Sequence, residues 1–217
     1  MKIETLDVQG FIPAIHAMRH PLQSYARNDT VVNIDGNVVI GPNDSDLSMR
    51  LQKAGTEHCK HLRMIMVWAD ITAPLTWWKQ ADCYRDGVEK ISTSTMHTLM
   101  KHELTADNFE PCNDGCYGQR LLETVDYINE SIRAYNAEQD PETKRKIWEY
   151  AIQILPQSFL QKRTVMFSYA ALRNIVRQRK GHKLKDWEIF IDWVHTLPYA
   201  DELIFDKDRS EEPGHDG

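Results

Sequence analysis

One long run of strand-forming residues limits the fold of this chain more than any other feature. Residues 62–72 read Leu-Arg-Met-Ile-Met-Val-Trp-Ala-Asp-Ile-Thr, a largely apolar sequence that predicts a central strand. Residues 73–81 follow as a predicted helix that begins at Ala73-Pro74. The chain lacks a regular alternation of strands with helices, which favours an α+β fold over a doubly wound sheet. No glycine-rich phosphate loop follows a strand, so a Rossmann or P-loop nucleotide site is disfavoured.

The remaining elements follow from local patterns. Two β-branched runs flank Asp35-Gly36, which predicts a hairpin over residues 31–40. Residues 84–102 are ambiguous, although residues 92–95 could cap a helix that starts near Met96. The other predicted elements are a helix from Pro13, a helix over 47–54 that ends at Gly55, a helix over 119–137, a helix from Pro141 to Leu155, a strand over 161–168, a helix capped by Ser168 that runs to about Lys180, and a helix over 185–197.

Length and composition exclude several classes of protein. The chain has 217 residues, 41% of them hydrophobic, which fits one domain or a tight pair. No run of about 18 apolar residues is present, so we expect no membrane span. Four cysteines are too few for a disulfide framework, which suits a reduced, cytoplasmic setting, and Cys112 and Cys116 lack the spacing of zinc ligands, so we expect no metal site. We expect a single domain over residues 1–198 and a frayed acidic tail over residues 199–217.

Positive charge is concentrated in one segment. The chain has a net charge of -6, but residues 157–185 contain no Asp or Glu and eight Lys or Arg. Arg173 and Arg177 lie four residues apart and share one face of the expected helix. The segment could bind an anion, because arginine side chains match phosphate geometry. A charge run taken alone is more often a solvated helix face, which here would offset the acidic tail.

Two ordered blocks of sequence carry a resemblance to a known family. The first block comprises a helix ending at Gly55, then Glu57-His58, the strand over 62–72, Ala73-Pro74, and a helix with Trp, Lys and Gln. The second block comprises Leu155-Pro156, a strand, Asn174, Arg179, His182 and Trp187-Glu188-Ile189. In the order and spacing of these features, the chain resembles the flavin-dependent thymidylate synthases.

The resemblance implies a fold, a reaction and a set of site residues. The implied fold is that of the thymidylate-synthase-complementing proteins, a central mixed or antiparallel sheet with flanking helices, in a homotetramer with shared active sites. The implied reaction converts dUMP to dTMP with FAD, NADPH and methylenetetrahydrofolate. Arg85 and Arg179 are then the candidate catalytic residues. The implied FAD contacts are His58, Arg85, Asn174 and His182, and the implied nucleotide contacts are Gln80, Ser92, Ser94 and Arg179.

The chain departs from the family pattern at three places. The family's Arg-His-Arg is Cys83-Tyr84-Arg85 here, and the arginine before its Leu-Pro is Ile152. The family's Ser-x-Arg element is replaced by residues 92–95, whose serines would supply hydroxyl groups in place of the lost arginine. These departures leave open a second hypothesis, a non-catalytic nucleotide- or flavin-binding protein of the same fold. A nucleic-acid-binding module that uses residues 157–185 is the third.

Several candidate residues also have a purely structural interpretation. His58 could donate to free carbonyl groups at a helix C-terminus. Arg85 could form a surface ion pair with Asp82 or Glu89. Residues 92–95 could be an N-cap cluster or a hydroxyl cradle for a phosphate at a helix N-terminus.

Overall fold

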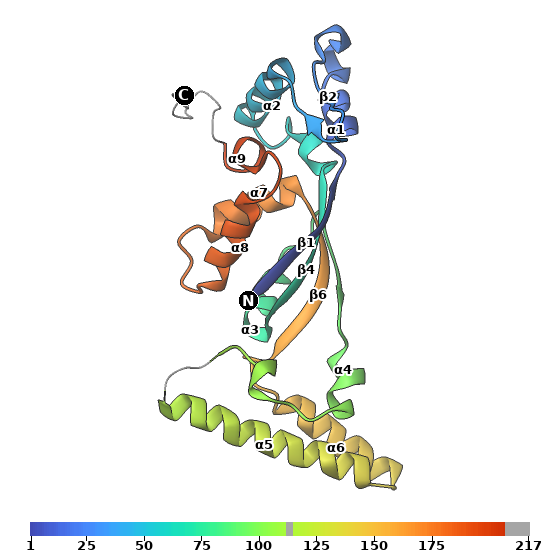
Figure 1. The fold of residues 1–217 in the computed structure, drawn as a ribbon, viewed down its shortest axis with the longest axis vertical. Coiled ribbons are helices and arrows are strands. Elements are labelled where there is room, and N and C mark those ends of the chain that lie inside the picture. The colour runs from blue at the N-terminus through green and yellow to red at the C-terminus, as the bar shows by residue number, and fades with distance from the viewer. Residues whose placement is uncertain (112–114, 207–217) are drawn as a thin grey trace. The chain divides into compact units, whose positions relative to one another are not determined.

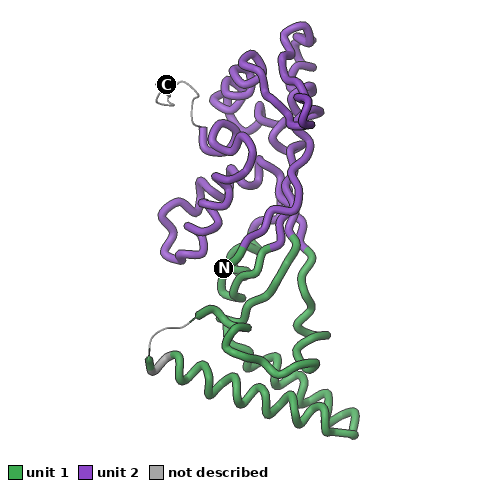
Figure 2. Tube along the Cα trace, viewed as in Figure 1, with its two compact units in different colours: residues 1–2, 71–83, 91–164 green, residues 3–70, 84–90, 165–217 purple. Residues whose placement is uncertain are grey.

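The structure is a computed structural model that describes residues 1–111 and 115–206. The described chain divides into two compact units, shown in Figure 2. Unit 1 comprises residues 1–2, 71–83 and 91–164, and unit 2 comprises residues 3–70, 84–90 and those from 165 onward. The strands of the main sheet contribute residues to both units.

The main sheet has four strands in the order β1-β4-β6-β5. They are β1 (Lys2–Gln9), β4 (Met66–Pro74), β5 (Val88–Ser92) and β6 (Leu160–Ser168). The sheet is antiparallel and has flanking helices, so the predicted α+β fold is confirmed. The central strand predicted over residues 62–72 is β4, which lies between β1 and β6 and begins only at Met66. The ambiguous segment 84–102 contains β5.

Unit 1 is dominated by two long helices that lie side by side, as Figure 1 shows. Its helices are α3 (Leu75–Ala81), α4 (Thr95–Thr98), α5 (Gly115–Ala137) and α6 (Pro141–Gln153), and its 3-10 helices are η4 (Leu99–Lys101) and η5 (Ala106–Asn108). The apolar periodicity of α5 places Val125, Ile128 and Ile132 in one buried core with Ala151 of α6. This core explains the pairing of the two helices, because burial of their apolar faces stabilises both.

Unit 2 contains most of the remaining helices. They are α1 (Phe11–Met18), α2 (Pro42–Ala54), α7 (Tyr169–Arg179), α8 (Asp186–His195) and α9 (Ala200–Leu203), with the 3-10 helices η1 (His20–Leu22), η2 (Tyr25–Arg27) and η3 (Lys60–Arg63). The helix α7 packs against both η3 and α8. The buried rings of Trp187 and Phe190 in α8 contact each other edge to face at 5.6 Å between centroids, and such aromatic burial fixes α8 firmly.

The predicted hairpin is present, with shorter strands than expected. Strand β2 (Val31–Val32) pairs antiparallel with β3 (Val38–Val39), and residues 33–37 connect them. The side chain of Asn33 accepts hydrogen bonds from the N–H groups of Asp35 and Asn37 at 3.1 and 2.8 Å. The turn is therefore built around Asn33 as well as Gly36, whose φ is +82°.

Helix α2 buries a polar stripe, not the apolar stripe that the sequence suggests. It begins at Pro42, directly after its N-cap Gly41, and ends before Gly55 as the sequence predicts. The buried residues of this helix are Asp44, Ser45, Ser48 and Gln52, whereas the expected stripe Leu47, Leu51 and Ala54 is only partly buried or exposed. The polar side of the helix faces the interior because it takes part in an extended hydrogen-bond network.

The packed part of the chain extends beyond residue 198. Residues Ala200–Leu203 form α9, and Ala200, Leu203 and Ile204 are buried. Residues 199–206 are thus not frayed, and the rest of the expected acidic tail, residues 207–217, lies outside the described residues. No helix in the described ranges combines the length and apolar composition needed to cross a membrane.

Candidate anion-binding site

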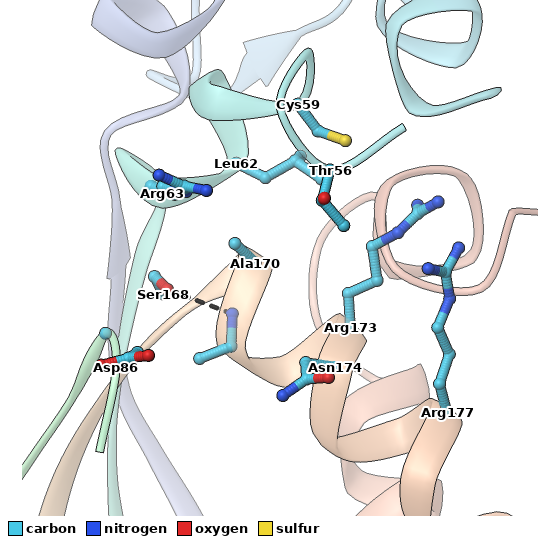
Figure 3. A pocket seen from close by; sticks show the side chains of 12 residues that line it. Thr56, Cys59, Leu62, Arg63, Asp86, Ser168, Ala170, Arg173, Asn174 and Arg177 are labelled. Carbon is cyan, nitrogen blue, oxygen red and sulfur yellow. Dashed lines mark hydrogen bonds between the residues drawn. The ribbon is translucent and has the colours of Figure 1, made fainter. Parts of the chain in front are cut away.

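A cavity of about 510 Å³ opens in unit 2 between the segment before β4, the turn before β5 and the start of α7. Figure 3 shows its side chains, which come from all three segments. The lining residues are Thr56, Cys59, Leu62, Arg63, Asp86, Gly87, Ser168, Ala170, Ala171, Arg173, Asn174 and Arg177. Three lining residues are arginines and one is an aspartate, so the lining carries a surplus of positive charge.

The start of α7 is held closely against the turn before β5. Ser168 is the N-cap of α7, as the sequence predicts, and its Oγ accepts from the N–H of Ala171 at 3.1 Å. The N–H of Ser168 donates to the carbonyl oxygen of Gly87 at 2.8 Å. Gly87 has a φ of +69°, and a Cβ atom there would collide with the Ser168 hydroxyl group. A glycine is therefore required where the two segments meet at the cavity.

Arg173 and Arg177 of α7 share one carboxylate. An Nη2 atom of Arg173 lies 2.5 Å from Oδ1 of Asp206, and Nη2 of Arg177 lies 2.8 Å from Oδ2 of the same residue. The Arg173 side chain is only 7% exposed, whereas those of Arg177 and Asp206 are 51% and 45% exposed. Arg173 also donates to the side-chain oxygen of Gln52 and to the carbonyl oxygen of Leu203. The buried guanidinium group is thus fixed from several sides.

A buried polar network continues from Arg173 into α2. The amide nitrogen of Gln52 donates to Ser48 Oγ at 3.2 Å, and Ser48 Oγ lies 2.8 Å from Nε2 of His61. Burial, together with the positive charge of Arg173, lowers the pKa of His61 to about 4. His61 is therefore neutral near pH 7. The buried polar stripe of α2 connects the cavity-lining Arg173 to the interior of unit 2.

A second cluster surrounds Arg179 at the end of α7. The Arg179 guanidinium group lies over the rings of Tyr84 and Trp187, at 5.3 and 4.6 Å from their centroids. Its Nε donates to the hydroxyl oxygen of Tyr84 at 2.8 Å. Two aromatic rings and one hydrogen bond therefore fix the plane of this guanidinium group.

A chain of hydrogen bonds connects this cluster to the cavity. The hydroxyl group of Tyr84 donates to Oε1 of Gln178 at 3.2 Å. The side-chain nitrogen of Gln178 donates to Oδ1 of Asn174 at 2.8 Å, and Asn174 lines the cavity. His182 lies near the same cluster, since its ring centroid is 6.3 Å from that of Trp187. The structure therefore brings together Asn174, Arg179 and His182, three of the residues expected at the site.

His58 and Arg85 are exposed and do not line the cavity, although residues next to each of them do. The N–H of His58 donates to the carbonyl oxygen of Gly55 at 3.0 Å, so this backbone group closes the turn after α2. The carbonyl oxygen of Arg85 accepts from the N–H of Val88 at 3.2 Å, just before β5. The contacts of the His58 and Arg85 side chains with FAD therefore remain a prediction.

Gln80, Ser92 and Ser94 belong to unit 1. Ser92 is exposed, and Gln80 and Ser94 are partly buried. Ser94 is the N-cap of the four-residue helix α4, but its side chain makes no capping hydrogen bond. The expected capping role of this serine side chain is therefore absent.

The basic segment 157–185 does not form one continuous solvated face. In unit 1, Arg163 lies over the ring of Trp78 at 4.2 Å and pairs with Asp82 at 2.8 Å. In unit 2, Arg173 is buried. The pairing of Asp82 with Arg163 also differs from the expectation that Asp82 could pair with Arg85. Much of the local positive charge therefore has a defined structural partner.

Sequence reasoning missed several residues of the cavity. Arg173 and Arg177 were not missed, because their spacing of four residues predicts the shared face of α7 that the structure shows. Arg63 and Asp86 had no such signal, since they lie in a 3-10 helix and a turn. Among the described residues, no group of three or more His, Cys, Asp or Glu side chains could hold a metal ion. Cys112 and the Cys116 side chain lie outside the described residues.

Comparison with known proteins adds one strong likeness. Neither protein-family models nor curated protein sequences give a match. Two crystal structures of the flavin-dependent thymidylate synthase ThyX from Helicobacter pylori, each with FAD and dUMP, match with TM-scores of 0.75 and 0.76. Both are 16% identical in sequence and cover 95% of this chain, and the match spans 98% and 99% of the ThyX chains. The fold is that of the flavin-dependent thymidylate synthases. At this identity, the likeness establishes a shared fold.

Proposed function

We propose that this chain is a flavin-dependent enzyme of the thymidylate synthase type that acts on a pyrimidine nucleotide such as dUMP. The proposed reaction transfers a one-carbon unit to the nucleotide, with FAD as cofactor and NADPH and methylenetetrahydrofolate as co-substrates. We further propose a cytoplasmic homotetramer with shared active sites. The observation that carries the proposal is the arginine-lined cavity at the start of α7, in a fold shared with proteins that were crystallised with FAD and dUMP.

The side chains at the cavity suit a cofactor that contains phosphate groups. A volume of about 510 Å³ falls within the usual range of small-molecule sites. Guanidinium groups supply strong hydrogen-bond donors to phosphate oxygens, and the Asn174 amide can donate or accept. FAD, when bound, would supply the hydride chemistry, while this chain would bind and orient it. Asn174 and His182, together with the exposed His58 and Arg85, would contact FAD.

The proposed nucleotide site uses residues from the second cluster. Arg179 would bind the nucleotide, because its guanidinium plane is fixed by Tyr84 and Trp187 before any ligand arrives. Gln80, Ser92 and Ser94 would supply further hydrogen-bonding groups to the nucleotide. Arg179 and Arg85 are the proposed catalytic residues.

The first experiment is the absorbance spectrum of the purified protein, followed by an assay for dTMP. We expect the absorbance of an oxidised flavin, or its appearance after FAD is added and free FAD removed. We expect chromatography to show dTMP formed from dUMP when FAD, NADPH and methylenetetrahydrofolate are present. The variant Arg179→Ala should lose nucleotide binding, while Arg50→Ala, which removes an exposed arginine of α2, should not. A protein that binds no flavin would exclude the proposal.

A non-catalytic binding protein of the same fold is the second candidate. The departures at Cys83-Tyr84-Arg85, at residues 92–95 and at Ile152 favour it. In the structure, the Tyr84 hydroxyl group is committed to Arg179 and Gln178. This candidate predicts bound flavin or nucleotide without any dTMP formation, so the same two measurements separate it from the enzyme.

The third candidate, a nucleic-acid-binding module, has less support. Such a module needs exposed positive charge that follows the nucleic-acid backbone. Arg163 and Arg173 in the basic segment are instead 15% and 7% exposed and are ion-paired. Binding to an oligonucleotide that weakens steeply with salt would revive this candidate.

A further inference from the structure

Two arginines of α7 converge on a single carboxylate at the cavity. Nη2 of Arg173 and Nη2 of Arg177 contact different oxygen atoms of Asp206, at 2.5 and 2.8 Å. Both arginines line the cavity. Two guanidinium groups that hold two oxygens of one anion are arranged as they would be for two oxygens of a phosphate group.

We propose that Arg173 and Arg177 form a phosphate subsite of the cavity, and that the Asp206 carboxylate occupies their donors until a phosphate group replaces it. The proposal rests on the proposed function and names the part of the site that would bind a phosphate group of the cofactor. Neither arginine is among the candidate contacts that follow from the family resemblance. Asp206 then acts as an internal competitor for ligand.

Arg173 stays in place when Asp206 leaves. Its buried guanidinium group also donates to the side-chain oxygen of Gln52 and to the carbonyl oxygen of Leu203. Gln52 is in turn hydrogen-bonded to Ser48 and to the carbonyl oxygen of Glu202. A donor fixed in this way loses little conformational entropy when a ligand binds.

Asp206 is placed so that it can leave. Its side chain is 45% exposed, whereas that of Arg173 is only 7% exposed. Its backbone has a φ of +61°, a conformation that is uncommon for residues other than glycine although aspartate tolerates it. Departure of Asp206 relieves this conformation and exposes a carboxylate that water solvates well.

The charges around the cavity favour the replacement of Asp206 by a phosphate group. The arginines lining the cavity are Arg63, Arg173 and Arg177, and the one acidic lining residue is Asp86. In Figure 3, Asp86 lies across the cavity from Arg173 and Arg177. The two linked phosphate groups of a dinucleotide cofactor together carry two negative charges and four non-bridging oxygens, whereas a carboxylate has one charge and two oxygens. Such a pyrophosphate group is therefore the better match for two guanidinium groups.

The test measures the affinity of the full-length protein for inorganic pyrophosphate, by calorimetry in a phosphate-free buffer. Because a competitor that occupies the donors lowers the apparent affinity by the fraction of time it is bound, Asp206→Asn should bind pyrophosphate at least about fivefold more tightly than the wild type. Arg177→Gln should bind about tenfold more weakly, since it removes one charge-assisted hydrogen-bond donor.

The ion pair between Arg50 and Asp46 provides matched controls. It joins an arginine and an aspartate at 3.0 Å on the exposed side of α2, within unit 2. Asp46→Asn and Arg50→Gln make the same charge changes and should leave the pyrophosphate affinity within about twofold of wild type. An Asp206→Asn variant that behaves like Asp46→Asn would overturn the competitor role. An Arg177→Gln variant that behaves like Arg50→Gln would overturn the subsite.

Two further measurements keep these outcomes separate. Thermal unfolding of each variant reports whether it folds, and Arg177 is exposed, so Arg177→Gln tests the subsite even if Asp206→Asn is unstable. Pyrophosphate binding requires neither flavin nor turnover. If the protein binds no flavin but binds pyrophosphate with the expected variant pattern, the subsite is upheld and the proposed function is excluded. If the protein binds flavin but the variants do not change the pyrophosphate affinity, the subsite is excluded and the proposed function stands.

Discussion

One ion pair of unit 1 and one of unit 2 differ sharply in burial. In the paired helices of unit 1, Arg145 and Glu149 form a pair at 2.5 Å with side chains 60% and 41% exposed. In unit 2, Arg19 and Asp44 form a pair at 2.6 Å with side chains 3% and 0% exposed. Exposed pairs contribute little to stability because water screens them. Buried pairs require exact partners, because each charge has lost its water.

The buried pair of unit 2 meets that requirement with additional hydrogen bonds. One oxygen of Asp44 accepts from Arg19, and the other accepts from the N–H groups of Asp29 and Thr30 and from the Thr30 hydroxyl group. Burial by itself would raise the pKa of Asp44, but these hydrogen bonds outweigh it and hold the pKa below its usual value. The difference between the two pairs teaches that unit 2, which also contains the cavity, fixes a buried charge through several hydrogen bonds.

The largest expected effect is the loss of Asp44. The variant Asp44→Ala leaves Arg19 buried without its partner, and it leaves three donors at Asp29 and Thr30 without an acceptor. We expect the free energy of unfolding to fall by about 3–5 kcal/mol, measured by urea denaturation. The control Asp46→Asn breaks an exposed pair and should cost less than about 1 kcal/mol. Equal losses in the two variants would contradict the contrast between buried and exposed pairs.

The next expected effect is a loss of stability at low pH. The pKa of His61 is lowered from 6.5 to about 4 in the folded protein, by burial and by the charge of Arg173. Below pH 6.5 the unfolded chain therefore binds a proton that the folded chain does not. The free energy of unfolding should fall as the pH drops from about 6.5 to about 4, by on the order of 3 kcal/mol in all.

Urea denaturation at a series of pH values checks this dependence. The variant His61→Gln should have a flatter profile than the wild type over that range, whatever its absolute stability. Asp44 titrates below its usual value of 3.8, so its contribution falls at lower pH. Identical slopes for wild type and His61→Gln would show that another group is responsible.

A smaller effect is expected at Tyr84. The variant Tyr84→Phe keeps the ring next to Arg179 but removes the hydroxyl group that bonds Arg179 and Gln178. Under the proposed function, we expect the KM for dUMP to rise about three- to tenfold, because the guanidinium group loses one orienting hydrogen bond. Tyr25→Phe, which removes an exposed hydroxyl group bonded to His20, is the control. A Tyr84→Phe enzyme with unchanged KM would show that the two rings alone position Arg179.

The smallest expected effect concerns the exposed ion pair of unit 1. The variant Glu149→Gln removes one partner of the exposed pair in α6. We expect a loss of only about 0.3–0.5 kcal/mol in the free energy of unfolding, and it should disappear at high salt. A loss above about 2 kcal/mol would mean that this pair is coupled to the helix core.

The sequence predicts the fold best where apolar pattern and burial coincide. The stripe of Val125, Ile128 and Ile132 in α5 and the apolar run of β4 both pack as their patterns indicate. Helix α2 shows the limit of this reasoning. Its buried side is polar, with Asp44 and Gln52 inside, because these side chains are satisfied by partners from distant parts of the chain. A pattern of hydrophobicity cannot reveal partners that only the folded chain brings together.

The same limit applies to the candidate site. The convergence of Asn174 and Arg179 could be anticipated because both lie on α7. Arg173 was visible as a positive charge, but its burial depends on Gln52 and on residues near Asp206, which are far away in sequence. Segments with irregular backbone contribute Arg63 and Asp86, and no periodic pattern marks such positions.

Gly87 makes the cavity sensitive to a single added methyl group. Because its carbonyl oxygen receives the N–H of Ser168 and its missing side chain leaves room for the Ser168 hydroxyl group, the first turn of α7 rests directly on the backbone before β5. Any larger residue at position 87 has to push that turn outward. The rigid helix would carry Arg173 and Arg177 outward with it. The absence of a Cβ atom at Gly87 therefore sets the width of the binding site.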